Sequence, residues 1–86
     1  PSAMPRSSSD AEYYTKQSVT AAENVTYYQE QAEKDKQDAA YYADHGEPDK
    51  AATSLSHAAA EQAKVTAYEK DKQDALDKAK AALGNE

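Results

Sequence analysis

The first half of the chain places small, aromatic and aliphatic residues at a helical spacing. From residue 11 to residue 42 they recur in alternating steps of three and four. This 3.5-residue period is typical of helices that pack as coiled coils. The positions are Ala11, Tyr14, Ser18, Ala21, Val25, Tyr28, Ala32, Asp35, Ala39 and Tyr42. The pattern predicts one long helix with a buried seam of Ala and Tyr side chains.

The second half repeats the spacing less clearly. With its leucines taken as core residues, the seam is Ala51, Leu55, Ala58, Gln62, Val65, Glu69, Lys72, Leu76, Ala79 and Leu83. The middle of this seam is polar, so a face that contains Tyr68 is an alternative there. Small residues let two helices approach closely, and each large Tyr can then lie against a smaller residue. We therefore expect a second long helix that packs against the first.

The helix boundaries carry recognisable signals. Ser9 to Glu12 fits a capping box, in which the serine hydroxyl accepts a hydrogen bond from the amide three residues later. Gly46 suits the left-handed position after a helix, and Pro48 suits the first turn of the next one. His45 would lie near the negative end of the first helix. The prediction is a helix over 9–45, a turn over 45–48 and a helix over 48–83.

The expected fold is all-α: an antiparallel two-helix hairpin with a coiled-coil-like Ala/Tyr seam, able to associate into a larger helical bundle. Two helices joined by so short a turn fold back on each other. With the turn centred between Gly46 and Glu47, facing residues have numbers that sum to about 93. Residues 1–8 contain two prolines and a serine run. They are predicted to be a flexible lead-in or a cloning remnant, and 9–86 the hairpin domain.

Composition limits what such a hairpin can bury. The chain of 86 residues has 19 Ala and 7 Tyr, but only seven residues that are Leu, Val or Met. Burial must come mainly from methyl groups and Tyr rings, so stability should be marginal without a partner or a second copy. The net charge of −6 argues against nucleic acid and anionic membranes. No apolar stretch approaches the roughly 18 residues of a membrane span, so no membrane insertion is expected.

Residues for catalysis or metal binding are scarce. The chain has no Cys and no Gly-rich phosphate loop, and its two histidines lie 12 residues apart. His57 and Glu61 stand one helical turn apart, but two such ligands on an acidic helix are common by chance. A two-helix hairpin also lacks a deep pocket that would exclude water. We expect no enzyme activity, no cofactor and no metal site.

Three tyrosine pairs are the most unusual feature, at 13–14, 27–28 and 41–42. They recur every 14 residues, about 21 Å along a helix. The second member of each pair falls on the seam, and the first is rotated by about 100° and should be partly exposed. One interpretation is that both members widen the apolar stripe. The other is that the first members bind a protein partner or a second copy: Tyr13, Tyr27 and Tyr41.

The predicted function is therefore a non-catalytic helical-hairpin module for protein interaction or spacing, within a larger protein. The Cys-free, Ala/Lys/Asp-rich composition resembles helical segments of Gram-positive surface proteins, which implies a cell-surface or extracellular location. It also resembles late-embryogenesis-abundant proteins, so a conditionally folded stress protectant is the alternative. The regular tyrosine pairs and the Gly-Glu-Pro turn favour the hairpin, because a chain selected for solvation does not need them.

Overall fold

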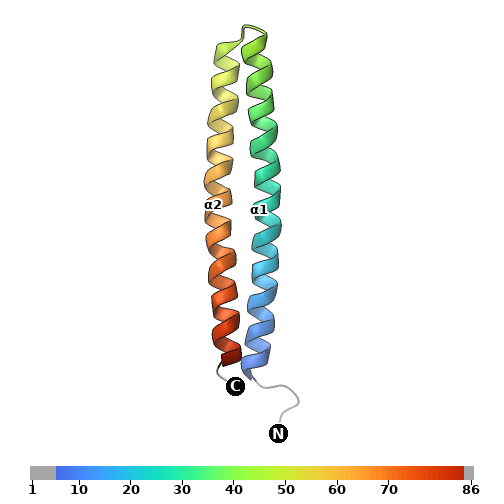
Figure 1. The fold of residues 1–86 in the computed structure, drawn as a ribbon, viewed down its shortest axis with the longest axis vertical. Coiled ribbons are helices and arrows are strands. Elements are labelled where there is room, and N and C mark those ends of the chain that lie inside the picture. The colour runs from blue at the N-terminus through green and yellow to red at the C-terminus, as the bar shows by residue number, and fades with distance from the viewer. Residues whose placement is uncertain (1–5, 85–86) are drawn as a thin grey trace.

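The computed structural model describes residues 6–84, which form two long helices and no strand. Helix α1 spans Arg6–Asp44 and α2 spans Pro48–Gly84. They lie side by side in opposite directions, so the start of α1 and the end of α2 meet at one end of the molecule (Figure 1). The result is a rod with extents of 70 × 16 × 11 Å. This confirms the predicted all-α antiparallel hairpin.

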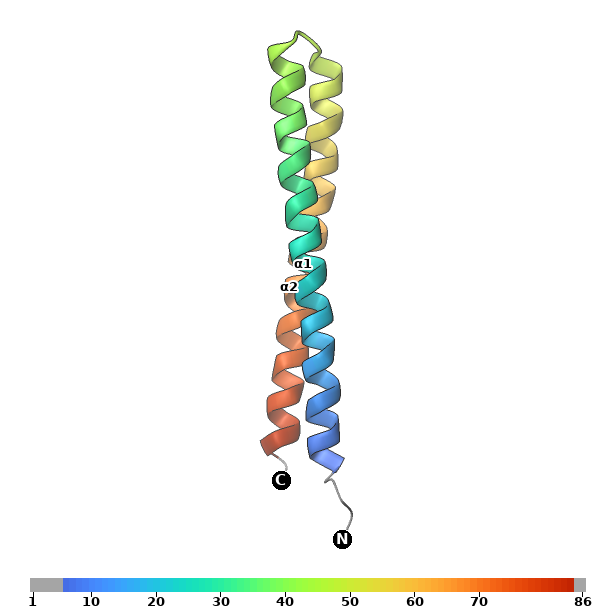
Figure 2. The same ribbon diagram turned by 90° about the vertical axis from the view of Figure 1, so that its right-hand side faces the viewer.

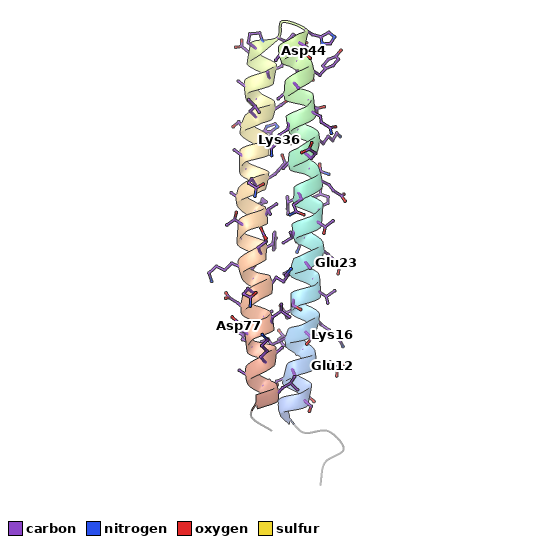
Figure 3. The ribbon with its side chains drawn as sticks, in the orientation of Figure 1. Glu12, Lys16, Glu23, Lys36, Asp44 and Asp77 are labelled. Carbon is purple, nitrogen blue, oxygen red and sulfur yellow. The ribbon has the colours of Figure 1, made fainter. Side chains whose placement is uncertain are left out.

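The start of α1 differs from the prediction. The helix begins at Arg6, so Ser9 lies inside it and is not its N-cap. The reason is that no helix breaker separates Arg6 from Ser9, because the nearest proline is Pro5. Residues 6–8, expected in a flexible lead-in, are helical, whereas residues 1–5 lie outside the described residues. Further along, Glu12 and Lys16 form an ion pair of 3.3 Å on the outer side of α1 (Figure 3).

A Schellman motif ends α1. Gly46 has a φ of 72°, the left-handed conformation that its sequence position predicts. The Gly46 amide donates to the carbonyl of Ala43 at 3.2 Å, and the Glu47 amide donates to that of Tyr42 at 2.8 Å. These two bonds satisfy carbonyls that the end of a helix would otherwise leave unpaired. The turn therefore closes α1 without help from any other part of the chain.

The second helix begins directly after this motif. Pro48 is the first residue of α2, where its missing N–H costs no helical hydrogen bond. The Glu47 carbonyl accepts the first bond of α2, from the Ala51 amide at 3.1 Å. On the other side of the turn, Nδ1 of His45 lies 2.7 Å from the Tyr41 carbonyl oxygen and donates to it. Glu47 thus belongs to the caps of both helices, which keeps the connection short.

The interface side of α1 follows the predicted spacing. All ten expected seam positions are buried or half-buried. The small side chains at Ala11, Ser18, Ala21, Ala32 and Ala39 are almost fully buried. The larger residues Tyr14, Val25, Tyr28, Asp35 and Tyr42 are half-buried. Backbones that approach through Ala and Ser leave the larger side chains to lie along the margins of the contact.

The interface side of α2 is partly different from the prediction. Its seam is Ala51, Ser54, Ala58, Glu61, Val65, Tyr68, Lys72, Ala75, Ala79 and Ala82. The placement of Leu55 and Leu83 in the seam is wrong, since both are 54% exposed, and Leu76 is half-buried at its edge. Small residues one position earlier take their places, because helices this close leave no room for Leu. Val65 is the most deeply buried side chain, at 1% exposure.

The register agrees with the expected centre of the hairpin. Tyr14, Tyr28 and Tyr42 meet Lys78, Lys64 and Lys50 respectively, and Tyr28 also meets Tyr68. The residue numbers of these pairs sum to 92 or 96, on either side of 93. Seen from the side, the two helices cross as they wind around each other (Figure 2). Such winding keeps a 3.5-residue seam facing its partner.

Candidate functional site

The three tyrosine pairs adopt the same arrangement. Within each pair the rings meet edge to face, with interplanar angles of 74°, 85° and 75°. Their centroids are 5.2 Å apart in the 13–14 pair, 5.0 Å in the 27–28 pair and 5.7 Å in the 41–42 pair. This geometry sets the positive edge of one ring against the negative face of the other. Each seam tyrosine therefore holds its exposed neighbour in a defined orientation.

A lysine from α2 completes each arrangement. The ammonium of Lys50 lies 5.6 Å from the centre of the Tyr42 ring. Lys64 lies 5.5 Å from the ring centre of Tyr28. In the third case, Lys78 lies 5.6 Å from that of Tyr14. The two helices thus contribute matching series, both with a spacing of 14 residues, to three Tyr–Tyr–Lys units.

The three units differ in what surrounds them. In the middle unit, Tyr28 also stacks on Tyr68 of α2, with centroids 5.7 Å apart and planes only 8° from parallel. At the turn, the His45 ring stacks on Tyr41 at 4.0 Å. Glu47 forms a 3.1 Å ion pair with Lys50 and thereby raises the pKa of that lysine. The middle unit is therefore the one tied most firmly into the hairpin.

The first tyrosines of the pairs form an exposed row along α1. Tyr13, Tyr27 and Tyr41 are 57%, 55% and 56% exposed, and we call them the tyrosine row. Their exposures agree because residues 14 apart occupy the same position in a seven-residue repeat. Each ring contacts a seam tyrosine that lies under a lysine of α2. The row and the three lysines therefore share one flank of the hairpin.

Exposed aliphatic side chains lie on the other flank. Leu55 and Leu83 follow Lys50 and Lys78 by five residues, about 140° around α2. Val19 of α1, 54% exposed, follows Tyr13 by six residues, about 120° around α1 away from the row. We call Val19, Leu55 and Leu83 the aliphatic flank. The molecule thus presents two faces of different chemistry, one aromatic and basic and the other aliphatic.

Two acidic residues meet in the seam between the tyrosine units. Asp35 of α1 and Glu61 of α2 are both half-buried. A hydrogen bond with the Asp35 carboxyl raises the pKa of Glu61, because that bond needs a proton on one of the two groups. Oε1 of Glu61 is buried and has no hydrogen-bond partner among residues 6–84. His57 borders the same shallow depression of about 310 Å³. The pair is a place where burial and charge oppose each other.

The arrangement favours contact with another molecule over chemistry. Within the described part of the chain, no three His, Asp or Glu side chains converge as a metal site would require. Neither α1 nor α2 has a stretch apolar and long enough to cross a membrane, as judged over residues 6–84. Sequence reasoning named the three exposed tyrosines but missed Lys50, Lys64 and Lys78. Their 14-residue spacing, equal to that of the tyrosine pairs, is the signal that would have found them.

Comparison with known proteins adds no relative from which a role could be transferred. The chain matches no protein-family model, no curated protein and no solved structure.

Proposed function

We propose that this chain is a non-catalytic interaction and spacer module of a larger protein, and that it binds a protein through the tyrosine row. The observation that supports this most is the equal, roughly half exposure of three rings placed at one repeat position along one helix. Large aromatic side chains exposed together are costly for solubility and are enriched at protein interfaces. Tyr suits the task because its ring is apolar and its hydroxyl remains able to form hydrogen bonds.

The packing beneath the row strengthens the proposal. Each exposed ring rests edge to face against a seam tyrosine, whose other contacts come from α2. Side chains held in one orientation before binding lose less conformational entropy when a partner arrives. A helix also keeps the rings at a constant spacing of about 21 Å, which a loop would not. The row is therefore a set of ordered anchors spread along a stiff rod.

The alternative function, a conditionally folded stress protectant, draws support from the weakness of the seam. Three charged side chains occupy seam positions: Asp35, Glu61 and Lys72. A thermal melt of the isolated chain, followed by circular dichroism, separates the two functions. A cooperative transition is expected for a packed interaction module, and gradual loss of helix would favour the protectant.

The role of the row is tested by replacing Tyr13, Tyr27 and Tyr41 together with Ser. The matched control replaces the aliphatic flank, Val19, Leu55 and Leu83, with Ser. Both triple variants should keep nearly the helicity of the parent chain, because all six side chains are more than half exposed. Proteins captured from an extract of the source cells by the parent chain should be lost with the tyrosine variant and retained with the control. Binding that survives in the tyrosine variant would refute the proposed face.

A further inference from the structure

We propose that the tyrosine row binds a second copy of this chain, which faces the first in parallel across the flank that carries the row. In this arrangement each ring of the row packs against a small residue on α2 of the other copy. The proposal rests on the proposed function, since it names the partner of the same face. It is carried by a feature of α2 that the single hairpin does not use.

That feature is a series of small exposed residues with the spacing of the row. Thr53, Ala67 and Ala81 lie 14 residues apart, and each follows one of the three lysines by three residues. All three are exposed. Residues three apart on a helix lie on the same side, so the series shares the flank of the lysines and of the row. The flank therefore carries three large rings on α1 and three small side chains on α2.

The rings and the small residues also lie at the same heights along the rod. Because the helices are antiparallel, Tyr13 is level with Ala81, Tyr27 with Ala67, and the third ring with Thr53. The numbers of these pairs sum to 94, within one of the hairpin register. When two copies face each other around a two-fold axis along the rod, α1 of each lies over α2 of the other. Every ring then meets a small residue, and the contact has neither clash nor void.

The opposite orientation fits less well. If the second copy were inverted, α1 would lie over α1, with Tyr27 of each copy in contact and Tyr13 against Tyr41. Rings would then oppose rings, while the small residues of the two α2 helices faced each other across a gap. The parallel arrangement also makes every helix antiparallel to both of its neighbours, as in an up-and-down four-helix bundle. Its two-fold symmetry is the commonest in soluble oligomers.

Charge and area are compatible with such a dimer. The positions between the rings pair Thr20 with Asp74 and Lys34 with Ala60, so no two like charges oppose each other in this row. Lys64 of one copy would lie beside Tyr27 of the other, adding a second ring to the one it already contacts. The flank measures 70 by 16 Å. It therefore offers about 1,100 Å² per copy, more than the roughly 800 Å² of a standard stable interface.

The test uses the full chain, which has no natural Cys. Sedimentation should show a dimer, and Ala67→Glu with Ala81→Glu should weaken it by more than about tenfold, because carboxylates would be buried against rings. These two changes leave every Tyr in place and put a good helix former at exposed positions, so helicity should persist. Under mild oxidation, chains carrying Tyr27→Cys should cross-link to chains carrying Ala67→Cys.

Each other outcome decides against the proposal in its own way. A chain that sediments as a monomer overturns self-association but leaves the tyrosine row available to a different protein. Efficient cross-linking of Tyr27→Cys chains to each other overturns the parallel orientation. A dimer that survives both the tyrosine triple variant and the Ala67→Glu, Ala81→Glu variant, but is lost with the aliphatic-flank variant, overturns this inference. The same result also contradicts the proposed use of the row for self-contact.

Discussion

Replacing Tyr28 with Ala should destabilise the hairpin far more than the same change at its neighbour Tyr27. Tyr28 is half-buried and contacts three partners: the Tyr68 ring, the Tyr27 ring and the Lys64 ammonium. Tyr27 is 55% exposed and has one of these contacts, the edge-to-face contact with Tyr28. The two residues are adjacent and chemically identical, so the comparison isolates position on the helix.

The expected magnitudes follow from these contacts. An aromatic pair contributes about 0.5–1.5 kcal/mol beyond the area that it buries, and an exposed cation–π contact about 0.5–1 kcal/mol. With the buried part of the ring included, Tyr28→Ala should cost about 3 kcal/mol, the lower end for a buried aromatic. Tyr27→Ala loses one pair and little burial, so it should cost about 1 kcal/mol. In a marginally stable domain the first loss is a large share of the total.

The assay is a thermal melt followed by far-UV circular dichroism at one protein concentration. In a domain of this size each kcal/mol lowers the Tm by roughly 4–8 °C, so Tyr28→Ala should lower it by about 12 °C or more. Tyr14→Ala is a useful comparison, because Tyr14 contacts Tyr13 and Lys78 but has no stacked ring described on α2. Its loss should be intermediate. Equal Tm values for the Tyr27 and Tyr28 variants would show that the contacts of Tyr28 with α2 contribute nothing.

Three further changes test other parts of the structure. Gly46→Ala should cost about 1–2 kcal/mol in unfolding experiments, through its φ of 72° alone, because open space surrounds the added methyl; an unchanged stability would contradict the strained turn. Val65→Ala should cost about 2 kcal/mol and Leu55→Ala less than about 1 kcal/mol, and the reverse order would restore Leu55 to the core. The raised pKa of Glu61 means that its protonated form favours the fold, so this stabilisation is full below the unfolded pKa of about 4.5 and is lost as the pH rises through the folded pKa. Glu61→Gln should therefore raise the Tm at neutral pH and flatten the gain in Tm on acidification, and a lower Tm at neutral pH would contradict this.

The seam of α1 could be predicted from the sequence because large and small residues alternate there with few charges. Tyr14, Tyr28 and Tyr42 mark one position of the repeat, and Ala marks most of the other. The same spacing placed Tyr13, Tyr27 and Tyr41 outside the seam, where they lie exposed. The hairpin itself followed from Gly46 and Pro48, whose backbone requirements are local. Features that depend on one helix alone were therefore accessible.

The seam of α2 was harder to predict because its most hydrophobic residues mislead. All three leucines of the chain, Leu55, Leu76 and Leu83, occupy one repeat position beside the seam, not within it. Choosing Leu over Ser54 or Ala82 assumes that a core prefers the larger side chain. In this hairpin the close approach of the helices reverses that preference. How closely two helices approach is a property of the pair, and no pattern in one helix reveals it.

The cross-helix contacts of the candidate site escaped prediction for a related reason. Lys64 looks like any solvated lysine until the register places it over the Tyr28 ring. Asp35 and Glu61 were assigned to different environments, and only pairing of the helices brings the two carboxyls together. A 14-residue spacing shared by tyrosines on one helix and lysines on the other is nevertheless visible in the sequence. Comparing the periods of the two helices is the step that would have linked them.

The position of both open ends at one end of the rod determines how the hairpin responds to mechanical force (Figure 1). A pull that separates residues 6 and 84 acts first on the layer around Ala11 and Ala82, and every deeper layer stays unloaded until this one opens. Rupture therefore proceeds as peeling, at a force set by single layers. A pull between the turn at Gly46 and the open end runs along the helix axes, and strains the backbone of each helix directly. The same rod is thus weak when its ends are drawn apart and stiff when it is stretched along its length.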